Sequence, residues 1–131
     1  MKPMKVLTFG TFDRLHPGHI AYLTQAKKHG DLYIIVARAE NVLHIKGRAP
    51  TQTVEERIHA LQEAFPDATV QAGDASDYLK PVRDIHPDII VMGYDQKLPP
   101  GVSEEDLSCA VERAEPFEPS VYKTSLLREN D

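Results

Sequence analysis

Apolar runs that alternate with helical patterns constrain the fold of this chain more than any other feature. The run from Leu32 to Ala37 reads Leu-Tyr-Ile-Ile-Val-Ala and is apolar throughout, which is typical of a strand covered on both faces in a parallel sheet. Strands joined through helices imply right-handed crossovers. We therefore expect an α/β fold, a Rossmann-like doubly wound parallel sheet of about five strands flanked by helices. The expected strands span residues 5–9, 32–37, 68–72, 88–92 and 109–115.

The intervening segments carry helix signals. A first helix is expected from Pro17 to about Lys28, with Gly30 as its stop signal. Thr53-Val-Glu-Glu56 has the pattern of a capping box, and apolar residues follow it at helical spacing. The polar stretch 41–50 is expected to be a loop. Shorter helices are expected to begin at Asp77 and to span 103–107 and 123–128.

Composition bounds the class of protein. The chain has 131 residues, is 41% hydrophobic and contains no linker or repeat, so we expect one domain over residues 1–131. No apolar run reaches membrane-spanning length and the first residues do not resemble a signal peptide, so the cytoplasm is the expected location. A single cysteine, Cys109, excludes an internal disulfide framework. The net charge of −5 argues against general binding of nucleic acid.

The segment Gly10-Thr11-Phe12-Asp13-Arg14-Leu15-His16-Pro17-Gly18-His19 lies where the first strand turns into the first helix. Unpaired N–H groups and the positive end of the helix dipole make such a turn a site for phosphate. His16 and His19 are spaced so that both rings can lean to one side of the helix. We expect Gly10 to adopt dihedral angles closed to other residues, and Gly18 to leave room for a ligand.

The alternative interpretations of the two histidines are a helix cap and a metal site. A lone histidine near a helix start is usually a cap or a solvated residue, but the combination with two glycines and a carboxylate favours a ligand site. The chain offers no third metal ligand at an obvious spacing, because Cys109 lies far along the sequence. We therefore assign no protein ligand to a metal.

A second segment is expected at the same sheet edge. In doubly wound sheets, ligands bind beyond the carboxyl ends of the strands, where the strand order reverses. The first strand brings the histidine segment to that edge and the fourth brings Gly93-Tyr94-Asp95-Gln96. Between them we expect a nucleotide site, although the chain lacks a G-x-G-x-x-G fingerprint and a Walker loop. Redox chemistry with a dinucleotide and P-loop ATP hydrolysis therefore lose support.

Cations follow the second strand. His44, Lys46 and Arg48 lie on the expected loop, and the next helix presents Arg57. Phosphoryl transfer needs positive charge for the nonbridging oxygens and the departing pyrophosphate. The alternative is that this segment is an ordinary solvated loop. The functional interpretation is favoured because an acidic chain has concentrated its cations beside the histidine segment.

The motif G-T-F-D-x-x-H-x-G-H, followed by V-A-R, K-G-R, E-E-R and P-D-I-I-x-x-G-Y-D-Q over residues 5–97, resembles the cytidylyltransferase-like nucleotidyltransferases. Within them the chain is most similar to archaeal-type FAD synthases and close to glycerol-3-phosphate cytidylyltransferases. The resemblance implies catalytic roles for His16, His19, Lys46 and Arg57. It also implies a nucleotide site formed by Gly10, Thr11, Phe12, Asp13, Gly18, Arg48, Gly93, Tyr94, Asp95 and Gln96.

Two stretches depart from the family pattern. Ala39 stands where relatives usually have an acidic residue, with Glu40 one position later. The segment Lys123-Thr124-Ser125 is comparable to a C-terminal stretch whose hydroxyls receive phosphate, and the alternative for it is a simple helix cap. It is retained as a candidate nucleotide-binding segment.

The expected reaction transfers a nucleoside monophosphate from a nucleoside triphosphate to a phosphorylated acceptor, with release of pyrophosphate. The favoured pair is ATP and FMN, with Mg²⁺ bound to the triphosphate. CTP with glycerol 3-phosphate or a similar alcohol phosphate is the alternative. A noncatalytic nucleotide sensor is a hypothesis from a different class, left open by Ala39. The resemblance also implies a homodimer.

Overall fold

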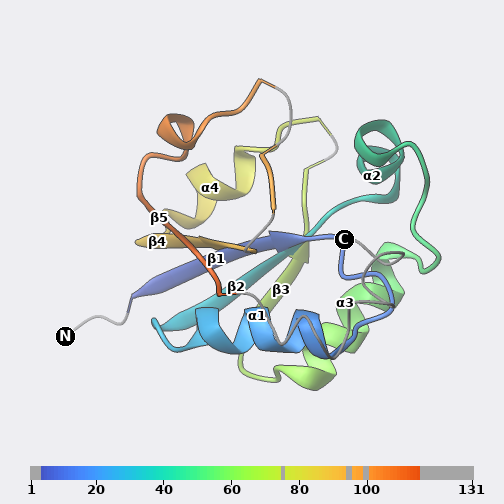
Figure 1. Cartoon of the computed structure of the whole chain (residues 1–131), viewed down its shortest axis with the longest axis horizontal. Helices are drawn as coiled ribbons and strands as arrows, with labels where there is room; N and C mark the ends of the chain where they lie inside the picture. Colours follow the sequence, from blue (N-terminus) through green and yellow to red (C-terminus); the bar gives the residue numbers. More distant parts are fainter. Residues whose placement is uncertain (1–3, 75, 94–95, 99–100, 116–131) are drawn as a thin grey trace.

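Five strands form one sheet in which every neighbouring pair is parallel, in the order β3-β2-β1-β4-β5 (Figure 1). The computed structural model describes residues 4–74, 76–93, 96–98 and 101–115. The expected Rossmann-like α/β sheet of about five strands is confirmed. The strands are β1 (Lys5–Gly10), β2 (Asp31–Val36), β3 (Thr69–Ala72), β4 (Ile89–Met92) and β5 (Ala110–Arg113).

Helices cover both faces of this sheet (Figure 1). On one face, Leu23 of α1 and Leu61 of α3 pack with Ile34 in one core cluster. On the other face, Val82 of α4 and Leu107 of η1 belong to a second cluster. In the described part of the chain, no helix has the length and apolar character needed to cross a membrane. The helices are α1 (Pro17–Lys27), α2 (Ala39–Lys46), α3 (Val54–Ala64), α4 (Lys80–Ile85) and the 3-10 helix η1 (Glu104–Leu107).

Local signals explain the two long helices. The Thr53 hydroxyl accepts the N–H of Glu56 at 3.1 Å, and the Glu56 carboxylate accepts the N–H of Thr53 at 2.9 Å. The expected capping box of α3 is therefore confirmed. After α1, the chain turns at Gly30, where a Cβ would lie 2.2 Å from the carbonyl oxygen of Met4. Glycine is required there because the backbone of the strand entry approaches so closely.

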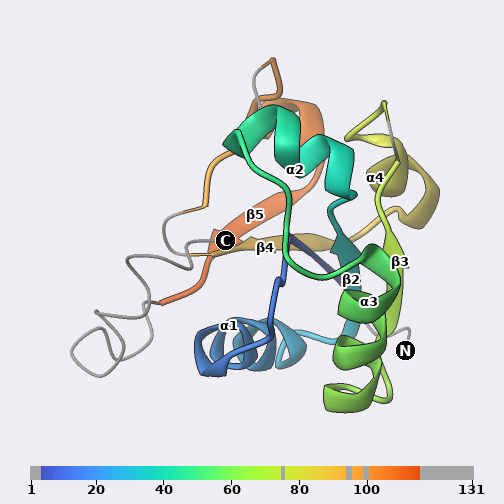
Figure 2. The same cartoon turned by 90° about the vertical axis from the view of Figure 1, so that its right-hand side faces the viewer.

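The expected loop over residues 41–50 is wrong in its first half, because residues 39–46 form α2. Val42 is buried, Glu40 lies in the first turn, and Gly47 ends the helix with a left-handed φ of 81°. An acidic residue near the start and a left-handed glycine after the end are ordinary helix boundary signals. The helix was missed because its 8 residues are too few for helical periodicity to be recognised in the sequence. α2 lies beyond the carboxyl end of β2 (Figure 2).

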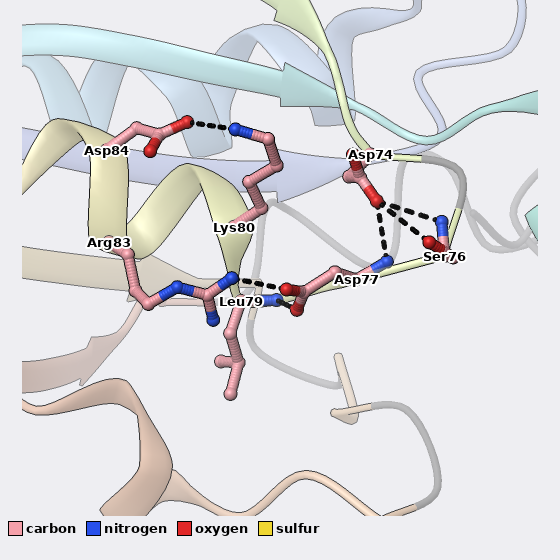
Figure 3. A network of polar contacts seen from close by, with 7 residues as sticks. All are labelled: Asp74, Ser76, Asp77, Leu79, Lys80, Arg83 and Asp84. Carbon is pink, nitrogen blue, oxygen red and sulfur yellow. Dashed lines mark hydrogen bonds and ion pairs between the residues drawn. The ribbon is translucent and has the colours of Figure 1, made fainter.

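The short helix expected to begin at Asp77 begins instead at Lys80. Two aspartates form turns ahead of it, as Figure 3 shows. The Asp74 carboxylate accepts the N–H groups of Ser76 and Asp77 at 3.0 and 2.8 Å, and the Asp77 carboxylate accepts the N–H of Leu79 at 3.0 Å. Aspartate side chains that bond to the backbone two or three residues on favour turns over helix, which explains the later start.

The strand order reverses at β1, which lies between β2 and β4. The ladder between β1 and β2 continues to Gly10↔Val36, whereas β1 and β4 pair only at Val6↔Ile89 and Leu7↔Ile90. The strands β1 and β4 therefore separate before they reach their carboxyl ends. The predicted switch point for ligand binding lies at this split.

Candidate active site

Two histidines form the start of α1. His16 is the N-cap residue, and its Nδ1 accepts the N–H of Gly18 at 3.1 Å. The N–H of His16 in turn donates to Nδ1 of His19 at 3.2 Å. The two rings stack with centroids 3.7 Å apart and an interplanar angle of 19°. The prediction that both rings lean to one side is confirmed, and the pair also forms a capping box made of imidazoles.

These caps fix the tautomer of each neutral ring. A nitrogen that accepts a hydrogen bond carries no proton, so both Nδ1 atoms are deprotonated acceptors. The proton of each neutral imidazole is then on Nε2. Each neutral ring then carries an N–H group on Nε2, which is the kind of donor that binds anionic oxygens.

The two glycines of the motif make room for side chains of the motif itself. A Cβ at Gly10 would lie 2.6 and 2.7 Å from ring carbons of Phe12, and one at Gly18 would lie 3.0 Å from Cε1 of His16. The expectation of unusual dihedral angles at Gly10 is wrong, because it is not among the described glycines with positive φ. Phe12 and Arg14 take the left-handed conformation instead, with φ of 54° and 52°.

Phe12 supports the histidines through its side chain. Its ring is 2% exposed, meets His19 edge-on at 5.4 Å and stacks on Tyr22 at 6.3 Å. Burial raises the pKa of the Tyr22 hydroxyl, which keeps it a protonated donor. Of the atoms of Phe12, only the backbone is suited to the predicted contact with a nucleotide, because the ring belongs to the core.

Asp13 anchors the motif to the entrance of α3. Its carboxylate accepts the N–H groups of Thr51 and Gln52 at 2.8 and 3.0 Å, together with the Thr51 hydroxyl at 3.0 Å. The N–H of Arg14 donates to the Gln52 side chain at 2.8 Å. These contacts hold the turn between β1 and α1 in place. No pattern in the sequence indicates these contacts, because Thr51 and Gln52 lie in an ordinary polar stretch.

Arg57 of α3 is fully buried, and its predicted role at the phosphates stays a prediction. Its Nη1 donates to the carbonyl oxygens of Thr11 and Ala37 at 2.9 and 2.6 Å, and its Nε donates to that of Gln52 at 3.3 Å. The guanidinium therefore ties together the motif, the end of β2 and the entrance of α3. It also places a fixed positive charge behind the backbone of Thr11, where it favours an anion in front.

The structure places some of the remaining predicted site residues and does not describe others. Thr11 is buried, Arg48 is exposed just after α2, and Lys46 is the last residue of α2. Gly93 and Gln96 lie at the end of β4, and the Gln96 side chain bridges to β1. The side chain of Lys46 and the residues Tyr94, Asp95, Lys123, Thr124 and Ser125 lie outside the described residues.

Sequence reasoning missed two side chains that hold this edge of the sheet. The Tyr22 hydroxyl donates to the carbonyl of Val91 at 2.5 Å, and Arg113 donates from Nη1 to the carbonyls of Gly93 and Gln96 at 3.1 and 2.7 Å. Tyr22 could have been found from its position one helical turn after His19. No sequence signal indicates the Arg113 contacts.

The cytidylyltransferase-like family model matches residues 7–129, and the chain belongs to this family. The matched residues cover nearly all of the parallel sheet of this chain and include the helix α1 that His16 caps. The crystal structure of the lipopolysaccharide core biosynthesis protein from Thermoplasma volcanium GSS1 superimposes on this chain with a TM-score of 0.80. It is 30% identical and the match covers 88% of this chain and 98% of that one.

Curated relatives narrow the comparison. The chain is 42% identical to the FAD synthase of Natronomonas pharaonis over 84% of this chain and 81% of the relative. It is 41% identical to the FAD synthase of Halomicrobium mukohataei, over 85% and 80% of the two chains. It is 38% identical to the FAD synthase of Halalkalicoccus jeotgali, over 95% and 89%.

Proposed function

We propose that this protein is an ATP:FMN adenylyltransferase, an FAD synthase. The observation that carries the proposal is the pair of stacked histidines whose Nδ1 atoms both accept backbone N–H groups at the start of α1. Identity of 38% to 42% with three FAD synthases over most of the chain supports ATP and FMN as the substrates.

The proposed reaction is an in-line displacement. A phosphate oxygen of FMN forms a bond to the α-phosphorus of ATP, the bond from that phosphorus to the bridging oxygen breaks, and pyrophosphate leaves with the electron pair. The nucleophile is already anionic near neutral pH, so the reaction needs no strong general base. His16 and His19 act as donors from Nε2 to phosphate oxygens, where negative charge increases in the transition state.

The residues around the histidines are proposed to position the phosphates and to provide positive electrostatic potential. The N–H groups at the start of α1 and its dipole favour phosphate, and Arg57 adds positive charge behind Thr11. Direct phosphate contacts by Lys46 and Arg48 and a nucleotide contact at Gly93 remain predictions. The nucleotide contacts of the predicted site residues that the structure does not describe also remain predictions. Asp13 and Gln96 act through the backbone groups that they hold.

Mg²⁺ is proposed to arrive coordinated by the phosphates of ATP. Among the described residues, no three His, Cys, Asp or Glu side chains are grouped so that they could hold a metal ion. When bound to ATP, the ion would neutralise part of the charge on its phosphate oxygens. The homodimer and the cytoplasmic location also remain predictions.

The test is a pyrophosphate-release assay that crosses ATP and CTP with FMN and glycerol 3-phosphate. We expect release with ATP and FMN only, with FAD identified by its mass. The histidines are tested with His16→Asn, which should lose turnover, and with His59→Asn on an exposed part of α3 as its matched control, which should retain full turnover. Turnover with CTP and glycerol 3-phosphate would replace the proposal by the alternative reaction. Nucleotide binding without turnover for every pair would favour the sensor hypothesis.

A further inference from the structure

The backbone at the split between β1 and β4 needs hydrogen-bond partners that the ladder does not provide. Pairing of these strands ends at Leu7↔Ile90. Beyond that point, the carbonyls of Phe9 and Val91 and the N–H of Gly93 are polar groups at the floor of the proposed nucleotide site. Polar backbone groups in such a place must be satisfied, or they destabilise the fold and disturb the site.

Two side chains meet this need. The Tyr22 hydroxyl donates to the Val91 carbonyl, as described above. The Gln96 side chain serves both strands at once, because its Oε1 accepts the N–H of Gly93 and its Nε2 donates to the carbonyl of Phe9, each at 2.9 Å. Phe9 immediately precedes Gly10 and Thr11, so Gln96 joins the end of β4 directly to the start of the histidine motif.

The chemistry of this bridge specifies an amide. The carbonyl of Phe9 can only accept a hydrogen bond, and the N–H of Gly93 can only donate one. A side chain between them must therefore donate on one branch and accept on the other. An ionised carboxylate can serve only the N–H, and an apolar side chain of the same length serves neither.

Further hydrogen bonds hold the backbone of Gln96 in place. Gln96 lies in a turn closed by its own N–H, which donates to the carbonyl of Gly93 at 3.1 Å. Arg113 of β5 donates to the carbonyls of both Gly93 and Gln96. The Gln96 side chain thus projects from a backbone that is fixed from the neighbouring strand, so its position is set before any ligand arrives.

We infer that Gln96 is a positioning residue that sets the Gly10–Thr11 backbone relative to the end of β4, and thereby the affinity for ATP. The inference rests on the proposed function. It assigns the effect of Gln96 to the hydrogen bond with Phe9 rather than to a contact between its side chain and the nucleotide.

The test compares Q96E and Q96M with the wild-type protein, and uses Gln62→Glu on the exposed face of α3 as the matched control. At pH 8 we expect Q96E to raise the KM for ATP by about tenfold to a hundredfold, since displacement of about 1 Å can have an effect of that size. The KM for FMN should stay within about twofold. Q96M should behave similarly, and Q62E should match the wild type.

A pH profile and NMR of the ligand-free protein distinguish positioning from direct contact. The carboxyl introduced by Q96E can donate to Phe9 once it is protonated, and its position against the Phe9 carbonyl favours the protonated form. The KM of Q96E for ATP relative to wild type should therefore begin to recover as the pH is lowered from 8 toward 5. Q96M should show no recovery. In both variants the amide resonances of Gly10 and Thr11 should shift without any nucleotide, because the Phe9 carbonyl has lost its donor.

Two results would overturn the inference. One is an unchanged KM for ATP in both variants. The other is a raised KM with unchanged Gly10 and Thr11 resonances in the free protein, which would indicate a direct contact with the nucleotide. Failure of the proposed function is distinguishable, because the wild-type protein itself would then form no FAD.

Discussion

His16 and His19 cap the same helix from opposite directions: His16 accepts a hydrogen bond from the backbone of α1, and His19 accepts one from the backbone of His16. One pair of side chains therefore both begins the helix and carries an N–H group on each Nε2. This dual role permits the structural and chemical contributions of each histidine to be separated by substitution.

For His16→Asn we expect turnover to fall by roughly 100-fold while stability is preserved, because removing one donor to a developing charge has about that effect. Asparagine is a favoured N-cap, so the free energy of unfolding should change by less than about 0.5 kcal/mol. Steady-state assays and urea denaturation measure the two quantities. Full turnover in this variant would contradict the assignment of His16.

Gly18→Ala should lower turnover about tenfold, because a Cβ at this position lies 3.0 Å from the His16 ring and must displace it. Stability should change by less than about 1 kcal/mol, since the better helix propensity of alanine opposes the crowding. The effect should vanish when Gly18→Ala is made in the His16→Asn background, where the ring is absent. An equal loss in both backgrounds would refute the explanation.

Gly93→Ala should fold normally and bind ATP more weakly. A Cβ there would make only ordinary contacts with Gln96, at 3.5 and 3.7 Å, so unfolding should change by less than about 0.5 kcal/mol. A bound nucleotide over the end of β4 would meet the added methyl group. Calorimetric titration with a nonhydrolysable ATP analogue measures the affinity, with Gly73→Ala after β3 as control. Equal affinity in the two variants would remove Gly93 from the site.

Arg57→Met should destabilise the fold by at least about 2 kcal/mol, because it leaves the carbonyls of Thr11, Ala37 and Gln52 without their donor. Urea denaturation measures this change. If Arg57 acted only by touching phosphate, the variant would lose activity and keep its stability.

Asp77→Asn should lower the melting temperature at pH 7 and have little effect near pH 2. The Arg83 side chain, drawn beside Asp77 in Figure 3, holds the pKa of the Asp77 carboxyl below its ordinary value of 3.8, and the N–H of Leu79 acts in the same direction. A lowered folded pKa gives stability that is present above the ordinary value and lost as pH falls through the folded one. Thermal melts from pH 7 to 2 measure the difference, and Asp67→Asn is the exposed control. A constant difference across that range would contradict the prediction.

Besides the sheet itself, the expectations that held depend on residues close together in the chain. The capping box at Thr53, the apolar run of β2 and the paired histidines each act over a few positions, where helix and strand periodicity are visible in the sequence. The helix α2 was missed because its 8 residues are too few for helical periodicity to be recognised. Its left-handed end at Gly47 was the available signal.

What the amino-acid sequence determined by itself was the order of the five strands and the two long helices, and the placement of the histidine turn at the end of β1. Only the tertiary structure decided that Gly10 makes room for the Phe12 ring, that Arg57 is buried under the turn and that Gln96 joins β4 to Phe9, 87 residues away. The physical reason is that a side chain chooses its hydrogen-bond partners only after packing has brought distant backbone groups together. Composition and spacing along the chain do not encode those distances.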